Sequence, residues 1–382
     1  MAPSALGRVL SSTLVGSEVL ANPIDNSTPP GSICAVRLSA IGDTCHTLPV
    51  LRTLKTAWPD TAITWIIGRT EASLMADIPE FEFITFDKSA GLAAYRDLRR
   101  RLAGRRFDAL LMMHASLRAN SVSRLVPARR RIGFDRQRGR DFQWLVSGER
   151  IPHRPRQHVM DGLFGFAEYL GVGERHLVWD IPVADADRGY AAGQMPPGRP
   201  WLVLSPCSSQ RARNYRNWSV ANYACIVDYA AERYGAGTVL TGGPAPLERE
   251  YGEAIAAAAA HTPLNLVGAT TLKQLFALIA RATVVVCPDS GPAHMATAAA
   301  TPVIGLYATS NPDRTGPYLS RHLVVNAYPE AVRREFDKPV DAIAWGRRVR
   351  DPAAMELIRT EDVEARLDEV LRSPDAAGPA SS

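Results

Sequence analysis

The sequence lacks an apolar run long enough to cross a membrane as a helix, which takes about 18 or more consecutive apolar residues. It also has little cysteine, with five among 382 residues, at positions 34, 45, 207, 225 and 287. These cysteines are dispersed and odd in number, so they suggest buried thiols instead of a disulfide framework or a zinc site. Residues 1–30 have Arg8 as their only cation and Glu18 among their apolar positions, which disfavours a secretory signal and makes a cytoplasmic location the expectation.

Length and composition predict a soluble protein of two domains. A chain of 382 residues exceeds the size at which a single core usually keeps growing. The apolar content of 46% and the charged content of 22% are ordinary for globular proteins. Residues 183–200 are rich in Asp, Gly and Pro and are the expected linker between domains at 31–182 and 201–355. Residues 1–30 are expected to form a flexible extension, and residues 374–382 a disordered tail.

Strand-like and helix-like segments alternate through both halves, which predicts an α/β protein with parallel sheets flanked by helices. Expected strands are 33–38, 62–67, 83–86 and 109–113 in the first half, and 201–205, 238–241, 283–287 and 303–307 in the second. A last helix over 361–371 has one apolar face.

The segment Cys-Pro-Asp-Ser-Gly-Pro-Ala-His-Met-Ala at 287–296 follows one of these strands and leads into a helical segment. The first N–H groups of such a helix are unpaired and favour an anion, so Ser290 and Gly291 are candidates for binding a diphosphate. His294, one turn into the helix, is placed to reach the same group. The alternative is a simple helix start, with Asp289 or Ser290 as the N-cap and Pro292 in the first turn.

A second strand, turn and helix follows at 36–51, with the sequence Val-Arg-Leu-Ser-Ala-Ile-Gly-Asp-Thr-Cys-His-Thr-Leu-Pro-Val-Leu. Gly42 suits a tight turn, and Asp43 falls at the start of the helix, at the carboxyl edge where open α/β sheets bind ligands. Asp43 is therefore either a helix cap or a reacting group. The segment lacks the three-glycine dinucleotide fingerprint and the Gly-Lys-Ser/Thr of a P-loop, so neither an NAD site nor a kinase-type site is supported.

These two motifs together resemble those of the ADP-heptose:lipopolysaccharide heptosyltransferases of glycosyltransferase family 9. The resemblance extends from about Ile33 to the last helix and implies two facing Rossmann-like domains, the GT-B architecture, with the active site between them. It implies that Asp43 is the general base and that Asp289, Ser290, Gly291 and His294 hold the donor diphosphate. It also implies that the C-terminal helix, at 356–373, packs back on the first domain.

The same resemblance suggests two further donor-binding residues. Family members usually carry a phosphate-binding lysine two residues before a tryptophan, and here that position is Arg216, whose planar guanidinium still binds phosphate. The loop that contains it also holds Arg211 and Arg213, for which an exposed charged loop is the competing interpretation. Glu248 is the candidate for contacting the donor ribose, and a carboxylate in the first turn of a helix is its alternative role.

Positive charge is concentrated in one part of the first domain. Residues 96–156 contain seventeen arginines and five acidic residues, a net charge of +12 in a chain whose total is +5. Such a region implies an anionic partner. By the resemblance this partner is phosphorylated lipid A with its acidic Kdo sugars, at the inner membrane of a Gram-negative bacterium, and Arg140, Arg156 and His158 are the candidate acceptor-binding residues. Nucleic acid is disfavoured because no zinc-finger, RNP-type or recognition-helix pattern accompanies the arginines.

The expected chemistry is inverting transfer of heptose from ADP-heptose, with no metal and no cofactor. A carboxylate can take the proton of the acceptor hydroxyl as it attacks the anomeric carbon, and fixed donors can stabilise the leaving diphosphate. No Asp-x-Asp motif stands where a metal–diphosphate site is expected, because Asp185-Ala-Asp187 falls in the linker. Two other classes stay open: a nucleotide-sugar epimerase on the same architecture, and a non-catalytic binder of anionic glycolipid or nucleic acid.

Overall fold

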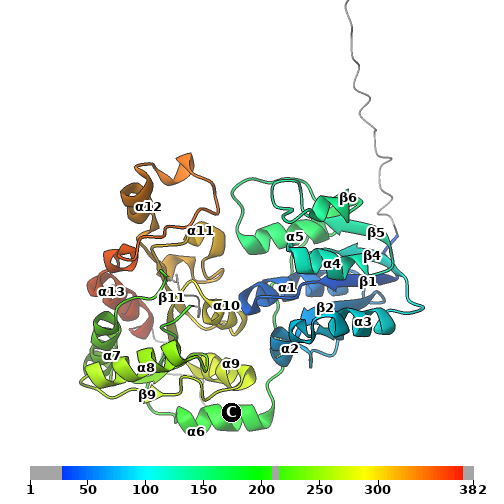
Figure 1. Ribbon diagram of the computed structural model, residues 1–382. Helices are drawn as coiled ribbons and strands as arrows, with labels where there is room; N and C mark the ends of the chain where they lie inside the picture. The colour runs from blue at the N-terminus through cyan, green and yellow to red at the C-terminus, as the bar shows by residue number, and fades with distance from the viewer. Residues whose placement is uncertain (1–27, 209–214, 373–382) are drawn as a thin grey trace, which may run out of the picture.

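The computed structural model describes residues 28–208 and 215–372. They form two domains that lie side by side, each built on a parallel six-stranded sheet (Figure 1). The strand order is β3-β2-β1-β4-β5-β6 in the first domain and β12-β11-β10-β7-β8-β9 in the second. The expected pair of Rossmann-like domains is thus confirmed. Arg211 and Arg213, the extension at 1–27 and the tail at 373–382 lie outside the described residues.

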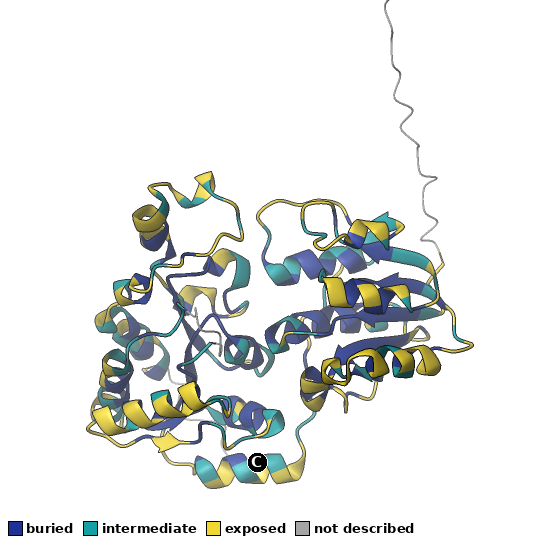
Figure 2. Cartoon of the chain, in the orientation of Figure 1, coloured by how far each residue is buried: buried dark blue, intermediate teal, exposed yellow. Residues whose placement is uncertain are grey.

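The central strands form where the sequence has uninterrupted apolar runs, since parallel strands covered by helices are buried on both faces (Figure 2). All eight expected strands are present, with ends shifted by at most a few residues. The four short or outlying strands β5, β6, β9 and β12 were not expected from the sequence. The strands are β1 Ser32–Val36, β2 Ala62–Gly68, β3 Glu82–Phe86, β4 Phe107–Leu111, β5 Ala128–Gly133, β6 Glu149–Arg150, β7 Trp201–Leu204, β8 Gly237–Leu240, β9 Leu264–Asn265, β10 Val284–Pro288, β11 Val303–Tyr307 and β12 Val325–Asn326.

Helices cover both faces of the first sheet. Residues of α1 (Ile41–Ala57), α2 (Arg69–Met75) and α5 (Val159–Tyr169) pack on one face, in the apolar cluster that continues into the second domain. Residues of α3 (Leu92–Arg101) and α4 (Leu117–Arg124) form a separate cluster on the other face. The face with α1 is therefore the one that meets the second domain.

The second sheet carries α9 (Leu272–Arg281) and α10 (Gly291–Ala298) toward the first domain. On its other side lie α7 (Val220–Tyr234), α8 (Pro246–Ala258), α12 (Tyr328–Phe336) and α13 (Thr360–Leu371), while α11 (Pro312–Thr315) follows β11. None of the helices in the described ranges is long and apolar enough to cross a membrane.

The C-terminal helix does not pack on the first domain, contrary to the expectation for 356–373. The apolar face of α13 belongs to the core of the second domain, where Val363 and Leu367 lie with side chains of α7. Asp368 adds two hydrogen bonds on the same side, accepting from Tyr229 Oη at 2.7 Å and Tyr234 Oη at 2.5 Å. The apolar face of this helix was correctly predicted to be buried. It packs on α7 of its own domain and not on the first domain.

The connection between the domains is partly helical. Asp185 and Asp187 lie in the first turn of α6 (Asp185–Gln194), so the segment expected as an irregular polar linker at 183–200 contains a helix. The two carboxylates favour a helix start because they lie near its positive end. The helix packs against α9 of the second domain and runs along the lower side of the molecule in Figure 1.

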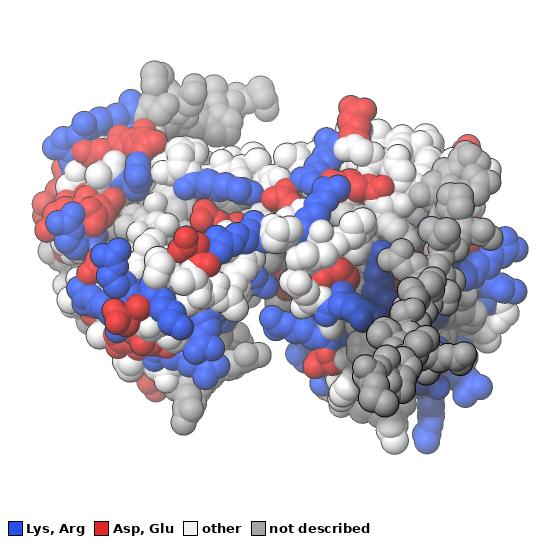
Figure 3. Space-filling model, turned by 90° about the horizontal axis from the view of Figure 1, so that it is seen from above, with Lys and Arg blue, Asp and Glu red and all other residues white. Residues whose placement is uncertain are grey.

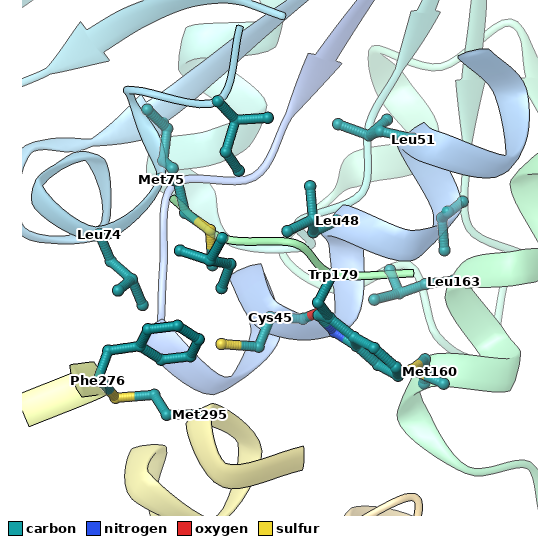
Figure 4. Packing of buried hydrophobic residues seen from close by; sticks show 14 of the residues in the cluster. Cys45, Leu48, Leu51, Leu74, Met75, Met160, Leu163, Trp179, Phe276 and Met295 are labelled. Carbon is teal, nitrogen blue, oxygen red and sulfur yellow. The ribbon is translucent and has the colours of Figure 1, made fainter. Parts of the chain in front are cut away.

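The domains meet through an apolar interface. Figure 4 shows Phe276 of α9 and Met295 of α10 packed beside Cys45 of α1 and Leu74 of α2. The exposed fraction of these side chains is 4% or less. The burial of these side chains holds α10 against α1 and so fixes how the two helices lie relative to each other.

Candidate functional site

Asp43 lies in the first turn of α1, directly beyond the carboxyl end of β1, as the sequence predicts. Its carboxylate forms an ion pair with Arg37, the residue that follows β1, and accepts a hydrogen bond from the backbone N–H of Ala40 at 3.3 Å. Arg37 is fixed in turn by a 2.6 Å bond from Nη1 to the carbonyl oxygen of Met113, beyond the end of β4. Asp43 therefore has a defined orientation while its side chain keeps 33% of its surface exposed.

The surroundings of Asp43 favour its ionised form. Burial raises the pKa of this carboxyl, but the positive charge of Arg37, the Ala40 N–H and His294 act in the opposite direction and hold the pKa below its usual range. A carboxylate that is ionised at neutral pH can accept a proton. No pattern in the sequence pointed to the ion pair of Arg37 with Asp43, although Arg37 stands six residues before Asp43 at the end of a predicted strand.

The second motif forms a helix start at the carboxyl end of β10. Ser290 is the N-cap residue of α10, with extended backbone angles, and Gly291 and Pro292 begin the helix. The Ser290 hydroxyl neighbours the Cys287 thiol and has no oxygen or nitrogen partner among the described residues. His294 Nδ1 is also buried and unpaired within those residues. This end of α10 thus offers unpaired donors together with the positive end of a helix.

The two helix starts approach each other across the domain boundary. A β carbon placed on Gly42 would lie 2.2 Å from Cδ2 of His294, and one placed on Gly291 would lie 3.6 Å from Cβ of Ile41. The charge of Asp43 also acts on the His294 ring. Burial lowers the pKa of His294, and the negative charges of Asp289 and Asp43 partly oppose this effect. The fold therefore brings together both sequence motifs, which are almost 250 residues apart.

Three histidine rings meet at the same boundary. His46 of α1 lies with its ring centroid 4.3 Å from that of His294 and 5.4 Å from that of His158. His46 is 2% exposed, and neither of its ring nitrogens has a hydrogen-bond partner among the described residues. Burial, followed by the His294, His158 and Arg37 charges, lowers the pKa of His46 well below its usual value. Sequence reasoning placed His46 only within a motif and assigned it no role.

A cluster of polar groups surrounds Asp289. Arg216 Nη1 donates to the carbonyl oxygen of Asp289 at 2.6 Å and lies 3.4 Å from its carboxylate. The same carboxylate accepts from the Ser310 hydroxyl at 2.7 Å and lies 3.7 Å from Arg348. Arg216 and Asp289 are thus neighbours, as expected for residues of one site, and the carboxylate is oriented toward cations and a hydroxyl.

Arg314, in α11, is a site residue that the sequence did not reveal. Burial lowers the pKa of its guanidinium, and Arg140, Asp289, Asp43 and Arg348 all act on it electrostatically. The charges of the candidate base Asp43 and of Asp289 therefore both act on the Arg314 guanidinium. Arg314 lines a small pocket with Ser310, Asn311 and the segment 345–348. Its motif, Asn-Pro-Asp-Arg-Thr-Gly-Pro at 311–317, has the turn residues of an ordinary loop, so only the fold shows its position.

Glu248 lies in the first turn of α8 and is 8% exposed. Its Oε2 accepts a hydrogen bond from the Gly243 N–H at 2.6 Å, in the turn that follows β8. The structure therefore shows the local role that was considered as its alternative. Its position at the carboxyl end of β8, on the same edge as α10, leaves the predicted contact with a ribose compatible with the fold.

The three candidate acceptor residues occupy different environments. Arg140 is exposed and lies close enough to act on Arg314 across the domain boundary. Arg156 is exposed as well, but its Nη2 donates to the Asp341 carbonyl oxygen of the second domain at 2.6 Å. His158 is 2% exposed; its Nδ1 accepts from the Met160 N–H at 3.1 Å and its Nε2 lies 3.0 Å from the Gly316 carbonyl oxygen. The geometry assigns His158 to the contact between the domains instead of to an acceptor.

The basic segment 96–156 is partly neutralised by ion pairs. Carboxylates of Asp97, Asp108, Asp135, Glu149, Glu82 and Glu168 pair with arginines 100, 101, 129, 138, 130, 105 and 154. Within the described ranges, arginines 118, 124, 136 and 140 form no ion pair. Viewed from above, Lys and Arg side chains gather on both domains where these approach each other (Figure 3). No group of three His, Cys, Asp or Glu residues in the described part of the chain is placed to hold a metal ion.

Comparison with known proteins gives a consistent result. The profile of glycosyltransferase family 9 (heptosyltransferase) matches residues 95–342. The chain is 39% identical over 334 residues to the lipopolysaccharide core heptosyltransferase OpsX of Haemophilus influenzae, covering 87% of this chain and 95% of that protein. It is 24% identical to lipopolysaccharide heptosyltransferase 3 of Escherichia coli, over 87% of this chain and 97% of that one.

Solved structures share the fold. The glycosyltransferase family 9 protein of Veillonella parvula has a TM-score of 0.74 at 21% identity, over 89% of this chain and 97% of that chain. An Escherichia coli heptosyltransferase solved with ADP has a TM-score of 0.68 at 18% identity, over 88% of this chain and 99% of that chain. At these identities the similarity demonstrates the two-domain fold.

Proposed function

The chain belongs to glycosyltransferase family 9 and is a lipopolysaccharide core heptosyltransferase, and we propose that it transfers heptose from ADP-heptose to the Kdo/heptose inner core with inversion and without a metal. The observation that carries this mechanism is the approach of the two helix starts. Asp43 of the first domain follows Gly42, which contacts the His294 ring of α10 in the second domain, and the charge of Asp43 acts on that ring. A reaction between an acceptor hydroxyl and a diphosphate leaving group requires a base and an anion site in this arrangement.

The donor diphosphate is assigned to the second domain. The N–H groups at the start of α10, the Ser290 hydroxyl and His294 are unpaired donors that suit phosphate oxygens. Arg216 and Arg348 supply positive charge. The Asp289 carboxylate would itself repel a diphosphate, so its proposed role is to orient these two arginines. Glu248 is proposed to accept a hydrogen bond from a ribose hydroxyl of the donor.

The acceptor is assigned to the side of the cleft formed by the first domain. Arg140 is exposed, unpaired within the described residues, and close to Arg314. The positive charge of Arg140 acts unfavourably on that of Arg314, and an acidic Kdo sugar of the acceptor would offset this repulsion by attracting both. Arg156 contributes to the same side by holding the domains together through Asp341. The reaction takes place in the cytoplasm, on the inner face of the membrane.

The proposed step is a single displacement. The acceptor oxygen forms a bond to the anomeric carbon of heptose while Asp43 takes its proton, and the bond between that carbon and the phosphate oxygen breaks. The electron pair stays on the departing ADP, where the start of α10, Arg216 and Arg314 stabilise the new charge. Attack from the face opposite the leaving group inverts the anomeric configuration.

The test is a transfer assay with purified protein, ADP-heptose and a truncated core acceptor, with the product identified by mass spectrometry. Asp43→Asn is expected to abolish transfer while ADP still binds, and Asp97→Asn, which removes a carboxylate of similar exposure on α3 of the same domain, serves as the matched control. Near-normal turnover of Asp43→Asn would show that Asp43 is only a helix cap. A chelator is expected to leave the rate unchanged, and loss of activity restored by a divalent ion would refute the metal-free mechanism.

The competing classes predict different products. An epimerase would convert the ADP-sugar in the absence of acceptor, and a non-catalytic binder would release no ADP at all. Membership of the heptosyltransferase family supports transfer over both. ADP release that depends on the acceptor identifies a transferase, and analysis of the ADP-sugar without acceptor then separates an epimerase from a binder.

A further inference from the structure

The loop between β5 and β6 reverses the usual placement of polar and apolar side chains. Gln143 is fully buried, whereas its neighbours Phe142, Trp144 and Leu145 are 65%, 50% and 64% exposed. Leu117, at the start of α4, is 66% exposed and its N–H donates to Asp141 of this loop at 3.0 Å. We call these four apolar residues the apolar patch. Scattered exposed leucines need no explanation, but a cluster with two aromatic rings marks an interaction site.

The loop is held in this conformation by specific bonds. Gln143 Nε2 donates to the carbonyl oxygens of Met112 at 3.0 Å and His114 at 3.3 Å, and its Oε1 accepts from the Phe134 N–H at 2.9 Å. Asn120 Nδ2 donates to the Asp141 carbonyl oxygen at 2.7 Å. The apolar side chains therefore point outward because the single polar side chain among them anchors the loop to the sheet.

The backbone of the loop supports the same reading. Asp141 and Phe142 have φ angles of 52° and 61°, in the left-handed region that β carbons disfavour. Such conformations are unfavourable for residues other than glycine and persist where the surrounding structure enforces them. The exposure of Phe142 is thus a built feature of the loop.

Four exposed arginines belong to the same two segments as the apolar patch, α4 and the loop between β5 and β6. Arg118 follows Leu117, Arg140 precedes the loop, and Arg124 and Arg136 lie on α4 and at the start of the same loop. All four are exposed and form no ion pair among the described residues. Arg140 is also the residue that acts on Arg314 across the domain boundary, so the apolar patch borders the proposed acceptor side of the cleft. In Figure 1, β6 and the loops around it form the top of the first domain.

We propose that the apolar patch and its four arginines dock on the surface of a membrane that contains anionic lipid. Tryptophan and phenylalanine insert favourably at the level of the lipid headgroups, and arginines close to the surface are attracted by anionic lipid. A protein partner would need only the apolar residues, whereas the four exposed arginines of the same segments are complementary to a negative surface. The direction of the docking rests on the proposed function, because the lipid-linked acceptor then reaches Arg140 from the membrane side.

The experiment measures binding of the full purified chain to vesicles of phosphatidylethanolamine with phosphatidylglycerol, compared with vesicles of phosphatidylcholine alone. The unsubstituted chain is expected to sediment with the anionic vesicles. Trp144→Ser is expected to bind about tenfold more weakly, because it removes one large apolar side chain that would be partly buried in the membrane surface. The triple variant Phe142→Ser, Trp144→Ser, Leu145→Ser removes three such side chains and is expected to bind about a hundredfold more weakly.

The matched control is Leu264→Ser, on the exposed edge strand β9 of the other domain, which is expected to bind vesicles like the unsubstituted chain. All variants should keep their thermal midpoint and their rate with a soluble acceptor that lacks lipid. The proposal is overturned by equal vesicle binding of the triple variant and the unsubstituted chain, by absence of binding to anionic vesicles, or by a chain dimer that the triple variant dissociates. Vesicle binding through the apolar patch without heptose transfer would refute the proposed function and leave the docking surface intact.

Discussion

The backbone of Gly42 lies directly against the ring of His294, although the two residues belong to different domains. A β carbon on residue 42 would lie 2.2 Å from Cδ2 of the ring, far inside van der Waals contact. Only glycine therefore allows α1 to approach α10 this closely. The relationship couples the position of the candidate base to the position of the anion site, since Asp43 is the next residue.

Gly42→Ala is expected to separate the two helix starts. The added methyl group must displace His294 or part the domains, and overpacking of this kind costs about 1–3 kcal/mol. We expect kcat to decrease at least tenfold, and the thermal midpoint to fall by an amount that leaves the protein folded at the assay temperature. Gly173→Ala, where the added carbon meets open space, is the control. Normal turnover of Gly42→Ala would show that the contact has no part in the reaction.

Replacing Arg37 should change the pH dependence of the reaction. The proposed base Asp43 must be ionised to accept a proton, and Arg37 keeps its pKa low against the opposing effect of burial. In Arg37→Gln the pKa of Asp43 rises, so activity is lost at a higher pH as the pH falls. We expect the rate at pH 5 relative to that at pH 8 to drop, by about tenfold for each unit by which the pKa of Asp43 in the variant exceeds 5. Arg37→Lys keeps the charge and should retain the original profile, whereas identical profiles for Arg37→Gln and the unsubstituted chain would contradict this role.

Acid is expected to weaken the boundary between the domains. The pKa of His158 is lowered to about 4, mainly by burial, and that of His46 is lowered well below 6.5. Histidines that stay neutral in the fold but titrate near 6.5 when unfolded contribute stability that is complete above pH 6.5. That stability is lost as the pH falls toward about 4, at about 1.4 kcal/mol per pH unit for each such histidine.

The matching variant is His46→Leu, which removes a ring whose two nitrogens have no partner among the described residues. His46, His158 and His294 together contribute part of the slope of the unfolding free energy against pH. We expect His46→Leu to remove about one third of that part between pH 4.5 and 6.5. Denaturant unfolding at several pH values measures this slope, with His322→Leu, at an exposed position, as the control. An unchanged slope in His46→Leu would place the acid sensitivity elsewhere.

Arg314 is expected to act on the reaction itself. The charges of Asp43 and Asp289 both act on its guanidinium, so Arg314 is proposed to stabilise the charge that develops on the leaving diphosphate. Arg314→Gln should lower kcat by about tenfold to a hundredfold, as expected for a lost charge-assisted contact worth roughly 1.5–3 kcal/mol. Affinity for ADP, measured by calorimetry, should fall as well. Arg334→Gln, an exposed arginine of α12 that pairs with Glu330, is the control, and equal rates for both variants would remove Arg314 from the site.

Much of the architecture follows from local sequence. Apolar runs such as Val284–Pro288 and Val303–Tyr307 can be buried only as central strands, and the small residues after them mark helix starts. The placement of Asp43 and Ser290 at the carboxyl edges of two sheets could therefore be predicted, because the end of a strand and the start of a helix both depend on neighbours in the chain. The strand β5 could not, since its sequence Ala-Arg-Arg-Arg-Ile-Gly has the composition of a charged surface and pairs only because the sheet extends to it.

Relationships between distant residues were decided by the tertiary structure alone. The sequence determined that α13 has an apolar face and that residues 36–51 and 287–296 form helix starts, because periodicity and turn residues act over a few positions. Which surface α13 covers, that Gly42 meets His294, and that Arg37 and Arg314 converge on Asp43 depend on how two domains pack. That packing is set by the sum of many buried apolar contacts, and no local pattern in the chain specifies it.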